Sequence, residues 1–319
     1  MSKVYSIKKL NKELSQNIWE NSLNLSIFSC PDFLTKLKNI EIYGAYKGQE
    51  IVACWPIKRN AKLNTHIPYF FYYFGPFFSS NFLNKHEHSR FINVHDVYTQ
   101  FLEFFKKKFE SIHFETHYTS TDIRAFDWWN YKNKNRFKIS PQYTAVIKNL
   151  NNKTEKNIIS NYRYVRRYEL KKFTKFKDDI YESDITLKQL ITEYFKTVNS
   201  NVTNKDLKEI KNSIKEIYNL AKSDHGKIVA FKDKKNKNIV SIIILLFDKN
   251  SSHLIVNLTS EKWKKMGIST WSIHKAIMLT KTLNINNFDF NGANSPQRGD
   301  NKHSFGSESL LYFNLKFNF

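Results

Sequence analysis

The sequence predicts an α/β protein with two domains, residues 1–150 and 151–319, each built from a mixed twisted sheet flanked by helices. The chain has 319 residues, whereas a single domain commonly contains about 100–200. Hydrophobic residues make up 41% of it and aromatic residues 16%, which is enough apolar material for two cores. Both halves also alternate helical spacing with short β-rich runs, and Gly and Pro are scarce (8 and 6). That scarcity disfavours all-β arrays with many tight turns.

The first half begins with a helical pattern and continues with strands. Apolar residues at near-helical spacing predict helix within 5–40: Leu10, Leu14, Ile18, Leu23 and Ile27. Two β-rich runs, 40–46 and 51–57, flank a Gly-containing turn and predict a hairpin. The aromatic run 69–78 predicts a strand that breaks into a loop at Gly75-Pro76. An amphipathic helix is expected at 95–109, followed by a strand from 112 to 114 and another at 142–147.

The second half repeats this plan without a detectable sequence repeat. Residues 154–175 combine helical periodicity with a dense basic face, and helices are also expected at 186–198 and 205–222. Strands are predicted at 227–231, 239–247 and 253–258. A helix at about 270–283 and strands at 288–290 and 310–317 complete the domain.

Composition limits the class of protein. The 51 Lys and Arg against 29 Asp and Glu give a net charge of +22, which suits polyanions such as nucleic acid, nucleotide diphosphates or anionic lipid. The excess of Lys, Asn, Ile, Phe and Tyr is equally consistent with A/T-rich codon usage. Cys30 and Cys54 lack the spacing of a zinc site or disulfide framework, and no metal site is expected. The start of the chain has no apolar signal core, so a cytoplasmic protein is expected.

The segment Lys264-Lys-Met-Gly-Ile-Ser-Thr270 follows a strand and opens a helix. The first free N–H groups of a helix carry partial positive charge, which suits a pyrophosphate. Lys264, Gly267, Ser269 and Thr270 are therefore candidate cofactor-binding residues. An ordinary helix N-terminus explains the same segment.

A second polar region follows the strand at 288–290. Phe288-Asp-Phe-Asn-Gly-Ala-Asn294 ends in a turn of small residues, and a polar loop leads to a second glycine turn at Gly306. Functional sites in α/β folds collect at strand ends, although an ordinary crossover loop has the same composition.

The third feature is the basic run that contains Arg163, Arg166 and Arg167. These arginines share one side of a helix, and the interleaved tyrosines at 162, 164 and 168 could stack on a base or sugar. A solvated basic helix face is the plainer interpretation.

Several familiar motifs are missing. The chain has no Gly-x-Ser-x-Gly elbow, P-loop or dinucleotide fingerprint. His113-Phe-Glu-Thr-His117 has the alternation of a strand and not the spacing of a metalloprotease. Isolated Asp residues give a two-carboxylate hydrolase little support.

Taken in order, these segments resemble the Fem family of peptidoglycan-peptide aminoacyltransferases and its relatives in the GNAT acyltransferase superfamily. In the first half the resemblance rests on four segments: Ile27-Phe-Ser-Cys-Pro-Asp-Phe33, Tyr46 to Ile57, Tyr73-Phe-Gly-Pro-Phe77 and Asp122-Ile-Arg-Ala-Phe-Asp-Trp-Trp129. The third of these resembles the Tyr-x-Gly-Pro loop of the family and makes Tyr73 a candidate substrate-binding residue.

In the second half, the basic run from Ser160 to Arg167 resembles the Arg-rich helix with which the family contacts its anionic substrate. Phe288-Asp-Phe-Asn-Gly292 and Lys302-His-Ser-Phe-Gly306 resemble the paired Asp-Phe-x-Gly and Lys-x-x-Phe-Gly motifs, which are the most specific match. Lys264-x-x-Gly267-x-Ser269 resembles a degenerate form of the superfamily's pyrophosphate loop. The long helical hairpin that some members use to hold tRNA is not seen.

The resemblance implies two tandem GNAT-like domains, the second of them catalytic, and an N-acyltransferase. Such an enzyme would transfer an acyl group from acetyl-CoA or another acyl-CoA, or an aminoacyl group from tRNA, to an amine of a cell-envelope precursor. Expected acceptors are a nucleotide-linked amino sugar or a peptidoglycan peptide, with no tightly bound cofactor and with the protein cytoplasmic or peripheral at the inner face of the membrane.

The implied roles are distributed over few residues. Asp289 or His303 would be the general base, and Lys302 or a backbone N–H would face the oxyanion. The three arginines would clamp a diphosphate, with Asn291 and Phe305 also binding substrate. Two alternatives remain open: a non-catalytic nucleic-acid-binding module that uses the basic helix, and an acyltransferase fold kept as a scaffold.

Overall fold

The computed structural model describes residues 5–197 and 204–319. The chain divides into two compact units, Met1–Gln142 with Leu311–Phe319, and Tyr143–Leu310. The sequence predicted a boundary at residue 150 and a second domain that continues to residue 319. The structure differs because the last strand leaves the second unit and completes the first.

Unit 1 contains a four-stranded antiparallel sheet in the order β1-β2-β3-β4 and a separate pair of strands, β5 with the end of β12. Its elements are β1 (Tyr5–Lys9), α1 (Lys12–Glu20), a short 3₁₀ turn at Ile27–Ser29, α2 (Pro31–Leu34), β2 (Ile40–Lys47), β3 (Glu50–Lys58), β4 (Phe77–Phe78), α3 (Ser80–Leu83), α4 (Glu87–Phe105), β5 (Ser111–Glu115) and α5 (Arg124–Asp127). Two long strands, β6 (Lys138–Ile147) and β12 (Glu308–Asn318), carry the chain from one unit to the other.

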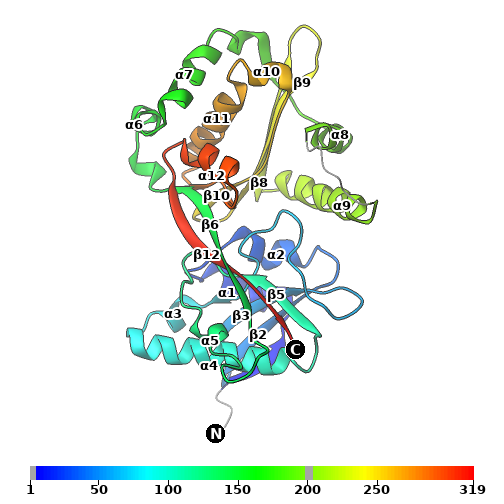
Figure 1. Cartoon of the computed structure of the whole chain (residues 1–319), viewed down its shortest axis with the longest axis vertical. Coiled ribbons are helices and arrows are strands. Elements are labelled where there is room, and N and C mark those ends of the chain that lie inside the picture. The colour runs from blue at the N-terminus through cyan, green and yellow to red at the C-terminus, as the bar shows by residue number, and fades with distance from the viewer. Residues whose placement is uncertain (1–4, 198–203) are drawn as a thin grey trace. The chain divides into compact units, whose positions relative to one another are not determined.

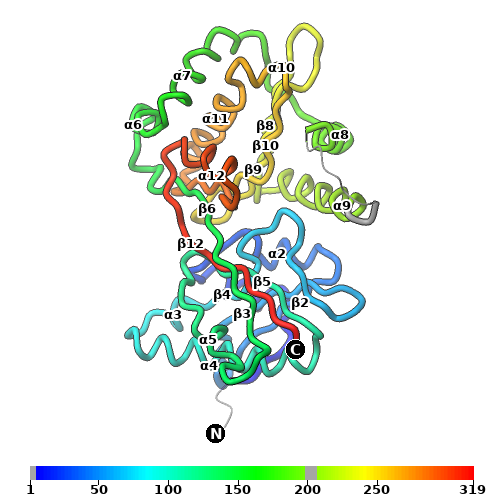
Figure 2. Tube along the Cα trace, viewed as in Figure 1, coloured from blue at the N-terminus to red at the C-terminus, as the bar shows by residue number. Residues whose placement is uncertain are grey.

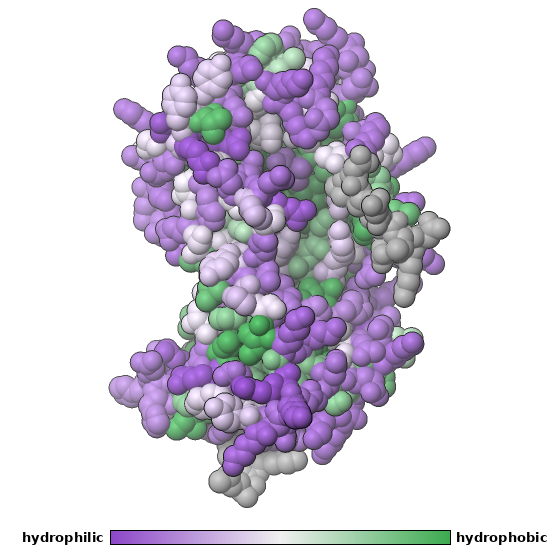
Figure 3. Space-filling model, in the orientation of Figure 1, coloured by the Kyte–Doolittle hydropathy of each residue, from purple (hydrophilic) through white to green (hydrophobic). Residues whose placement is uncertain are grey.

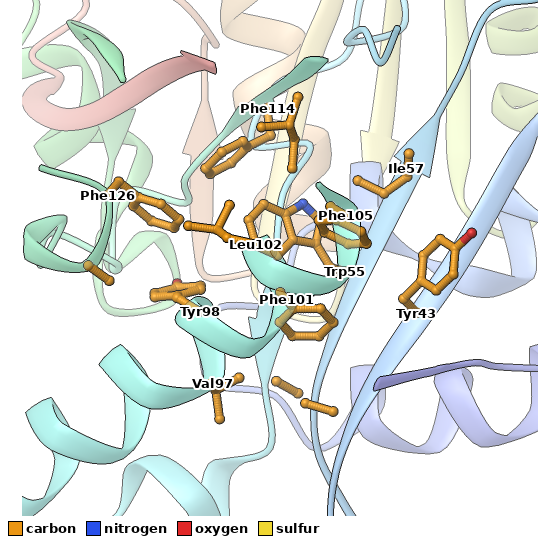
Figure 4. Packing of buried hydrophobic residues seen from close by; sticks show 14 of the residues in the cluster. Tyr43, Trp55, Ile57, Val97, Tyr98, Phe101, Leu102, Phe105, Phe114 and Phe126 are labelled. Carbon is orange, nitrogen blue, oxygen red and sulfur yellow. The ribbon is translucent and has the colours of Figure 1, made fainter. Parts of the chain in front are cut away.

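The core of unit 1 is aromatic. Trp55 on β3 is fully buried, and four phenylalanine rings lie within 6.1 Å of its ring, centroid to centroid. Figure 4 shows them converging on the indole: Phe101, Phe105, Phe114 and Phe126. These rings come from α4, β5 and α5, so the indole fixes those elements to the sheet.

The predicted helix within 5–40 is only partly correct. Residues 5–9 form β1, which pairs with β2, and helix begins at Lys12 after Asn11, whose side chain accepts a hydrogen bond from the Leu14 amide. Of the apolar residues at helical spacing, Leu14 and Ile18 belong to α1, whereas Leu10, Leu23 and Ile27 lie outside it. The hairpin at 40–57 and the strand at 112–114 are confirmed.

In unit 2 six strands follow one another in the order β6-β11-β10-β9-β8-β7. All neighbouring pairs are antiparallel except β10 with β11, which is parallel. The elements are η2 (Leu150–Asn152), α6 (Glu155–Ser160), α7 (Tyr164–Phe173), η3 (Lys177–Asp179), β7 (Ile180–Glu182), α8 (Leu187–Thr197), α9 (Asn204–Ala221), β8 (Gly226–Asp233), β9 (Ile239–Phe247), β10 (Ser251–Thr259), α10 (Glu261–Lys264), α11 (Ile268–Thr282), β11 (Asn287–Asp289) and α12 (Pro296–His303).

Helices cover both faces of this sheet. Figures 1 and 2 show α7 and α11 on one face and α8 and α9 on the other. Strand β9 is buried from Val240 to Leu246 without alternation, as expected for a strand covered on both sides. The three successive strands predicted between 227 and 258 are confirmed, as is the helix at about 270–283.

The predicted helix at 154–175 is interrupted. Helix α6 ends at Ser160 and α7 begins at Tyr164, with Arg163 extended (φ −55°, ψ 148°) between them. The side chain of Tyr162 is buried at this break, and the Arg163 amide donates to the carbonyl of Ser304. The interruption is therefore caused by contacts distant in the sequence. The predicted helix 186–198 ends at Thr197, and residue 198 lies outside the described residues.

The surface matches the composition. Hydrophilic side chains cover most of the face seen in Figure 3. In the part of the chain that the structure describes, no helix is both long and apolar enough to cross a membrane.

Candidate functional site in unit 2

The parallel strands β10 and β11 separate after a short pairing. Ser251, Ser252 and His253 pair with Asn287, Phe288 and Asp289, and β10 then continues to Thr259. The side chain of Asn291 donates to the carbonyl of Leu254 at the point where β11 leaves (3.0 Å). Ligand sites in α/β sheets lie at the carboxyl ends of strands, so the end of β11 at Asp289 is a potential site.

A fully buried polar network lies at the point of divergence. The Nε2 atom of His253 is 2.8 Å from Asp248 Oδ2, and its Nδ1 atom is 3.1 Å from Asn291 Oδ1 and 3.6 Å from Asp289 Oδ2. With an acceptor opposite each ring nitrogen, both nitrogens donate and the imidazole is protonated. Burial lowers the pKa of His253, but the hydrogen bonds and charges of Asp248 and Asp289 outweigh it and raise the pKa to about 10.

Asp289, a predicted general base, belongs to this network. Its carboxylate accepts hydrogen bonds from Thr144 Oγ1 (2.5 Å) and the Asn291 amide (2.8 Å). Burial opposes ionisation, but these bonds and His253 hold the pKa of Asp289 below its usual range. Because the side chain has no exposed surface, it orients its neighbours and cannot contact a substrate in this conformation.

Lys302, on α12, points its ammonium group at the backbone turn that follows β11. It donates to the carbonyls of Asn291 and Gly292, the latter at 2.6 Å. Burial lowers the pKa of Lys302 to about 8, while the charge of Asp289 acts in the opposite direction. While it is protonated, an ammonium group of this kind is suited to stabilising developing negative charge, and it loses this charge as the pH rises through about 8.

His303 is the neighbouring residue on α12 and has a different environment. Its Nε2 atom is 3.1 Å from Ser309 Oγ and its Nδ1 atom is 3.2 Å from Ser307 Oγ. The side chain is partly exposed. Of the two predicted bases, His303 is therefore the one that a substrate could reach.

Two glycines that the sequence had linked to a site lie against the chain at and just before α7: Gly267 faces Glu169 of α7, and Gly306 faces Asn161 in the turn before it. A methyl group on Gly267 would lie 2.6 Å from the carbonyl oxygen of Glu169, and one on Gly306 would lie 2.7 Å from that of Asn161. Both glycines also have positive φ, +93° and +71°. The group that approaches each glycine closely is thus the backbone of this chain and not a ligand. The start of α11 and the turn at Gly306 therefore lie against α7 and the turn that precedes it.

The three arginines of this region bind the protein itself. Arg166 donates to Ser304 Oγ (2.7 Å) and to Glu169 (2.6 Å). Arg163 forms a two-bond ion pair with Asp300 (2.7 and 3.1 Å), and Arg167 donates to the backbone carbonyls at 160 and 162. To bind a diphosphate, the arginines would have to give up these bonds. The Arg163–Asp300 ion pair is the easiest to break, because both of its side chains are half-exposed.

The residues predicted to bind a cofactor pyrophosphate lie at the start of α11. Gly267 is the N-cap residue, and Thr270 is buried and donates to the Glu169 carboxylate. Ser269 is partly buried, and Lys264 is exposed and pairs with Glu261. A carboxylate from α7 thus already lies near the partial positive charge of this helix start.

Two predicted substrate-binding residues are in protein cores. Phe305 is 1% exposed and packs against Tyr162 and Phe290 in unit 2. Tyr73 lies in unit 1, is also 1% exposed, and its ring contacts His117 and Tyr312. Tyr162, predicted to stack on a base, is buried, whereas Tyr164 and Tyr168 are 73% and 55% exposed.

The sequence did not indicate His253, Asp248, Glu169 or Thr144 as parts of this region. The one available signal was the Ser251-Ser-His253 segment at the start of an otherwise largely aliphatic strand. Buried polar side chains need hydrogen-bond partners, so this segment indicated a polar network. Three buried side-chain oxygens of β10 have no hydrogen-bond partner within the described residues: Ser252 Oγ, Asn257 Oδ1 and Thr259 Oγ1. Within the same residues, no group of three His, Cys, Asp or Glu side chains is placed to hold a metal ion.

The two α/β units, with a parallel pair of strands inserted in the antiparallel sheet of unit 2, define the class. The chain has a Fem-like, GNAT-type acyltransferase fold. No family model and no curated protein sequence matches it.

Among solved structures, FemX is similar over 97% of this chain and 96% of its own, with a TM-score of 0.65 and 9% identity. A tandem GNAT protein from the clavulanic acid biosynthesis pathway is similar over 98% of both chains (TM-score 0.53, 5% identity). L-PGS from Bacillus licheniformis is similar over 98% of this chain and 93% of its own (TM-score 0.51, 9% identity).

Proposed function

We propose that the protein is an N-acyltransferase that acts on an amine of a cell-envelope precursor, such as a nucleotide-linked amino sugar or a peptidoglycan peptide. The observation that carries the proposal is the placement of Lys302. Its partly buried ammonium group, with a pKa of about 8, lies beside the turn after β11 in an acyltransferase fold. No covalent intermediate with the enzyme is needed, because the amine attacks the donor carbonyl directly.

The steps follow from the groups present. The acceptor nitrogen forms a bond to the acyl carbon, and the carbonyl oxygen becomes negatively charged. Lys302 stabilises this oxyanion, and His303 removes the proton from the nitrogen. The bond from carbon to the donor oxygen or sulfur then breaks, and the departing group takes up a proton. Asp289 and Asn291 hold the turn that Lys302 contacts.

We favour aminoacyl-tRNA over acyl-CoA as the donor. Glu169 and the backbone of α7 occupy the start of α11, where a CoA pyrophosphate would otherwise bind. Helix α7 presents exposed Tyr164, Tyr168 and Lys171, and exposed Lys175 follows just after the helix. Exposed aromatic rings among lysines suit a nucleic acid. The proposed location is cytoplasmic or peripheral at the inner face of the membrane.

A transfer assay tests the proposal. Radiolabelled aminoacyl-tRNAs and acyl-CoAs are each offered with nucleotide-linked amino sugars and peptidoglycan-precursor peptides, and products are identified by mass. Acceptors and donors are preselected by the rise in melting temperature that a ligand of the native state causes. We expect Lys302→Met to lower the rate by about 10²–10³-fold, with exposed Lys235→Met as the matched control. Equal rates for both variants would reject the assigned site.

The closed start of α11 also favours a second function, that of a non-catalytic scaffold with this fold that binds nucleic acid through α7. In that case no donor is turned over, and tRNA binding is retained with the strong salt dependence typical of phosphate contacts. The same assay separates the two functions, because only the enzyme consumes its donor.

A further inference from the structure

Unit 1 contains a pocket that no proposed step of the acyl transfer uses. It has a volume of about 550 Å³, within the range of small-molecule sites. It lies between the first turns of α4, the loop that follows β5 and the bend after α1. All of its lining residues belong to unit 1.

The pocket has an apolar interior. Phe78 and Tyr98 form buried parts of its lining, and Leu83 and Val94 are partly exposed toward it. Leu23 is 59% exposed and also lines the pocket. An apolar group entering here would remove this surface from water, which is favourable.

The rim carries charges of both signs in equal number. Glu87 and Arg90 come from α4, and Asp122 and Arg124 come from the loop after β5 and the start of α5. The Arg124 guanidinium makes two bonds to Asp122 (2.9 and 2.6 Å) and lies 3.8 Å above the Phe91 ring. Both members of this ion pair are half-exposed, so solvent screens it and a ligand can exchange with it at low cost.

The pocket is built before any ligand arrives. The Asn24 side chain, 4% exposed, accepts from Ser22 Oγ (2.9 Å) and the Phe78 amide (3.3 Å) and donates to Ser120 Oγ (2.9 Å). One amide therefore ties the bend after α1 to β4 and to the loop after β5. Such preorganisation lowers the entropic cost of binding.

We infer that this pocket binds a small zwitterion with an apolar side chain, namely an amino acid or a short peptide. The ligand's ammonium group meets Glu87 or Asp122, its carboxylate meets Arg90 or Arg124, and its side chain enters the apolar interior. A simple anion or cation would also be repelled by the rim charges of its own sign. The inference does not depend on the proposed transferase activity.

Isothermal titration calorimetry on the full chain tests it with defined probes. L-phenylalanine and the dipeptide Leu-Phe carry both charges, whereas phenethylamine and 3-phenylpropanoate each lack one. We expect at least one zwitterion to bind roughly tenfold or more tightly than either analogue, because charged hydrogen bonds are lost with the missing group. Binding of phenylalanine identifies a free amino acid as the ligand, and binding of the dipeptide alone identifies a peptide.

Two variants and one control locate the binding. Arg90→Met removes an exposed cation and should weaken the zwitterion by roughly tenfold, while Val94→Trp should abolish binding by filling the interior. Exposed Lys107→Met, outside the pocket, should bind as the wild type does. The inference is overturned if no zwitterion binds at up to about 10 mM, if the single-charge analogues bind equally well, or if Val94→Trp binds normally with an unchanged melting temperature.

Discussion

Glu115 makes the stability of unit 1 depend on pH in a way that one substitution can isolate. Its carboxylate accepts hydrogen bonds from the Tyr73 amide (3.2 Å) and the Asn314 side chain (3.0 Å), yet it is 9% exposed. Burial raises its pKa from 4.5 to about 7, although both hydrogen bonds act to lower it. Between pH 4.5 and about 7, Glu115 is therefore protonated in the folded chain and ionised in the unfolded chain.

The sign and size follow from linkage. Because the pKa of Glu115 is higher in the folded state, its contribution to the free energy of unfolding is greatest below pH 4.5. This contribution falls as the pH rises to about 7 and then levels off. At 1.36 kcal/mol per pKa unit, the difference corresponds to about 3 kcal/mol. Glu115→Gln removes the titration, and its single acceptor oxygen keeps one of the two hydrogen bonds. We expect the stability of the variant relative to the wild type to rise by about 3 kcal/mol between pH 4.5 and above pH 7.

Urea denaturation of both proteins between pH 4.5 and 8, followed by tryptophan fluorescence and circular dichroism, measures this difference. The variant at exposed Glu110, Glu110→Gln, is the matched control and should show a difference that does not change with pH. Other groups titrate in the same range, but they cancel between variant and wild type. A constant difference between wild type and Glu115→Gln across the range would refute the reasoning.

Three further predictions concern unit 2. Gly267→Ala should destabilise the protein by about 1–3 kcal/mol in urea denaturation, because the methyl group meets the Glu169 carbonyl and φ is positive; an unchanged midpoint would mean that α7 does not pack there. His253, with its raised pKa, should remain protonated as the pH rises until about 10, and an NMR titration near 6.5 would contradict the buried network. If Lys302 acts as an ammonium group, the rate of transfer should fall as the pH rises through about 8. In Lys302→Arg this fall should occur at a higher pH; if it stays near pH 8, another group causes it.

The sequence predicted those parts of the fold that depend on local pattern. The strands between 227 and 258 and the helix at about 270–283 are correct because each is an uninterrupted apolar run or a regular periodicity. Strand β1 was missed because the strand with which it pairs, β2, lies more than thirty residues away in sequence, at 40–47. The break between α6 and α7 was missed because it depends on the carbonyl of Ser304.

The candidate site shows the same limit. The motifs around Asp289 and Lys302 could be found because they are short and contiguous, and the structure places both residues at one turn. Their environments could not be predicted, since His253 and Asp248 reach Asp289 only through the parallel pairing of β10 with β11. The sequence therefore predicted Asp289 or His303 as a general base, whereas the fold buries Asp289 beside His253.

The return of β12 to unit 1 has a consequence for synthesis. Strand β5 pairs with Asn314–Asn318, and Leu315 and Phe317 belong to the same aromatic core as Trp55. The ribosome makes these residues only after the whole of unit 2, so unit 1 waits with an open strand edge and an incomplete interior until then. An unpaired edge of this kind is vulnerable to aggregation, which makes the nascent first half a natural client for chaperones and makes any fragment ending before residue 311 a poor starting point for expression.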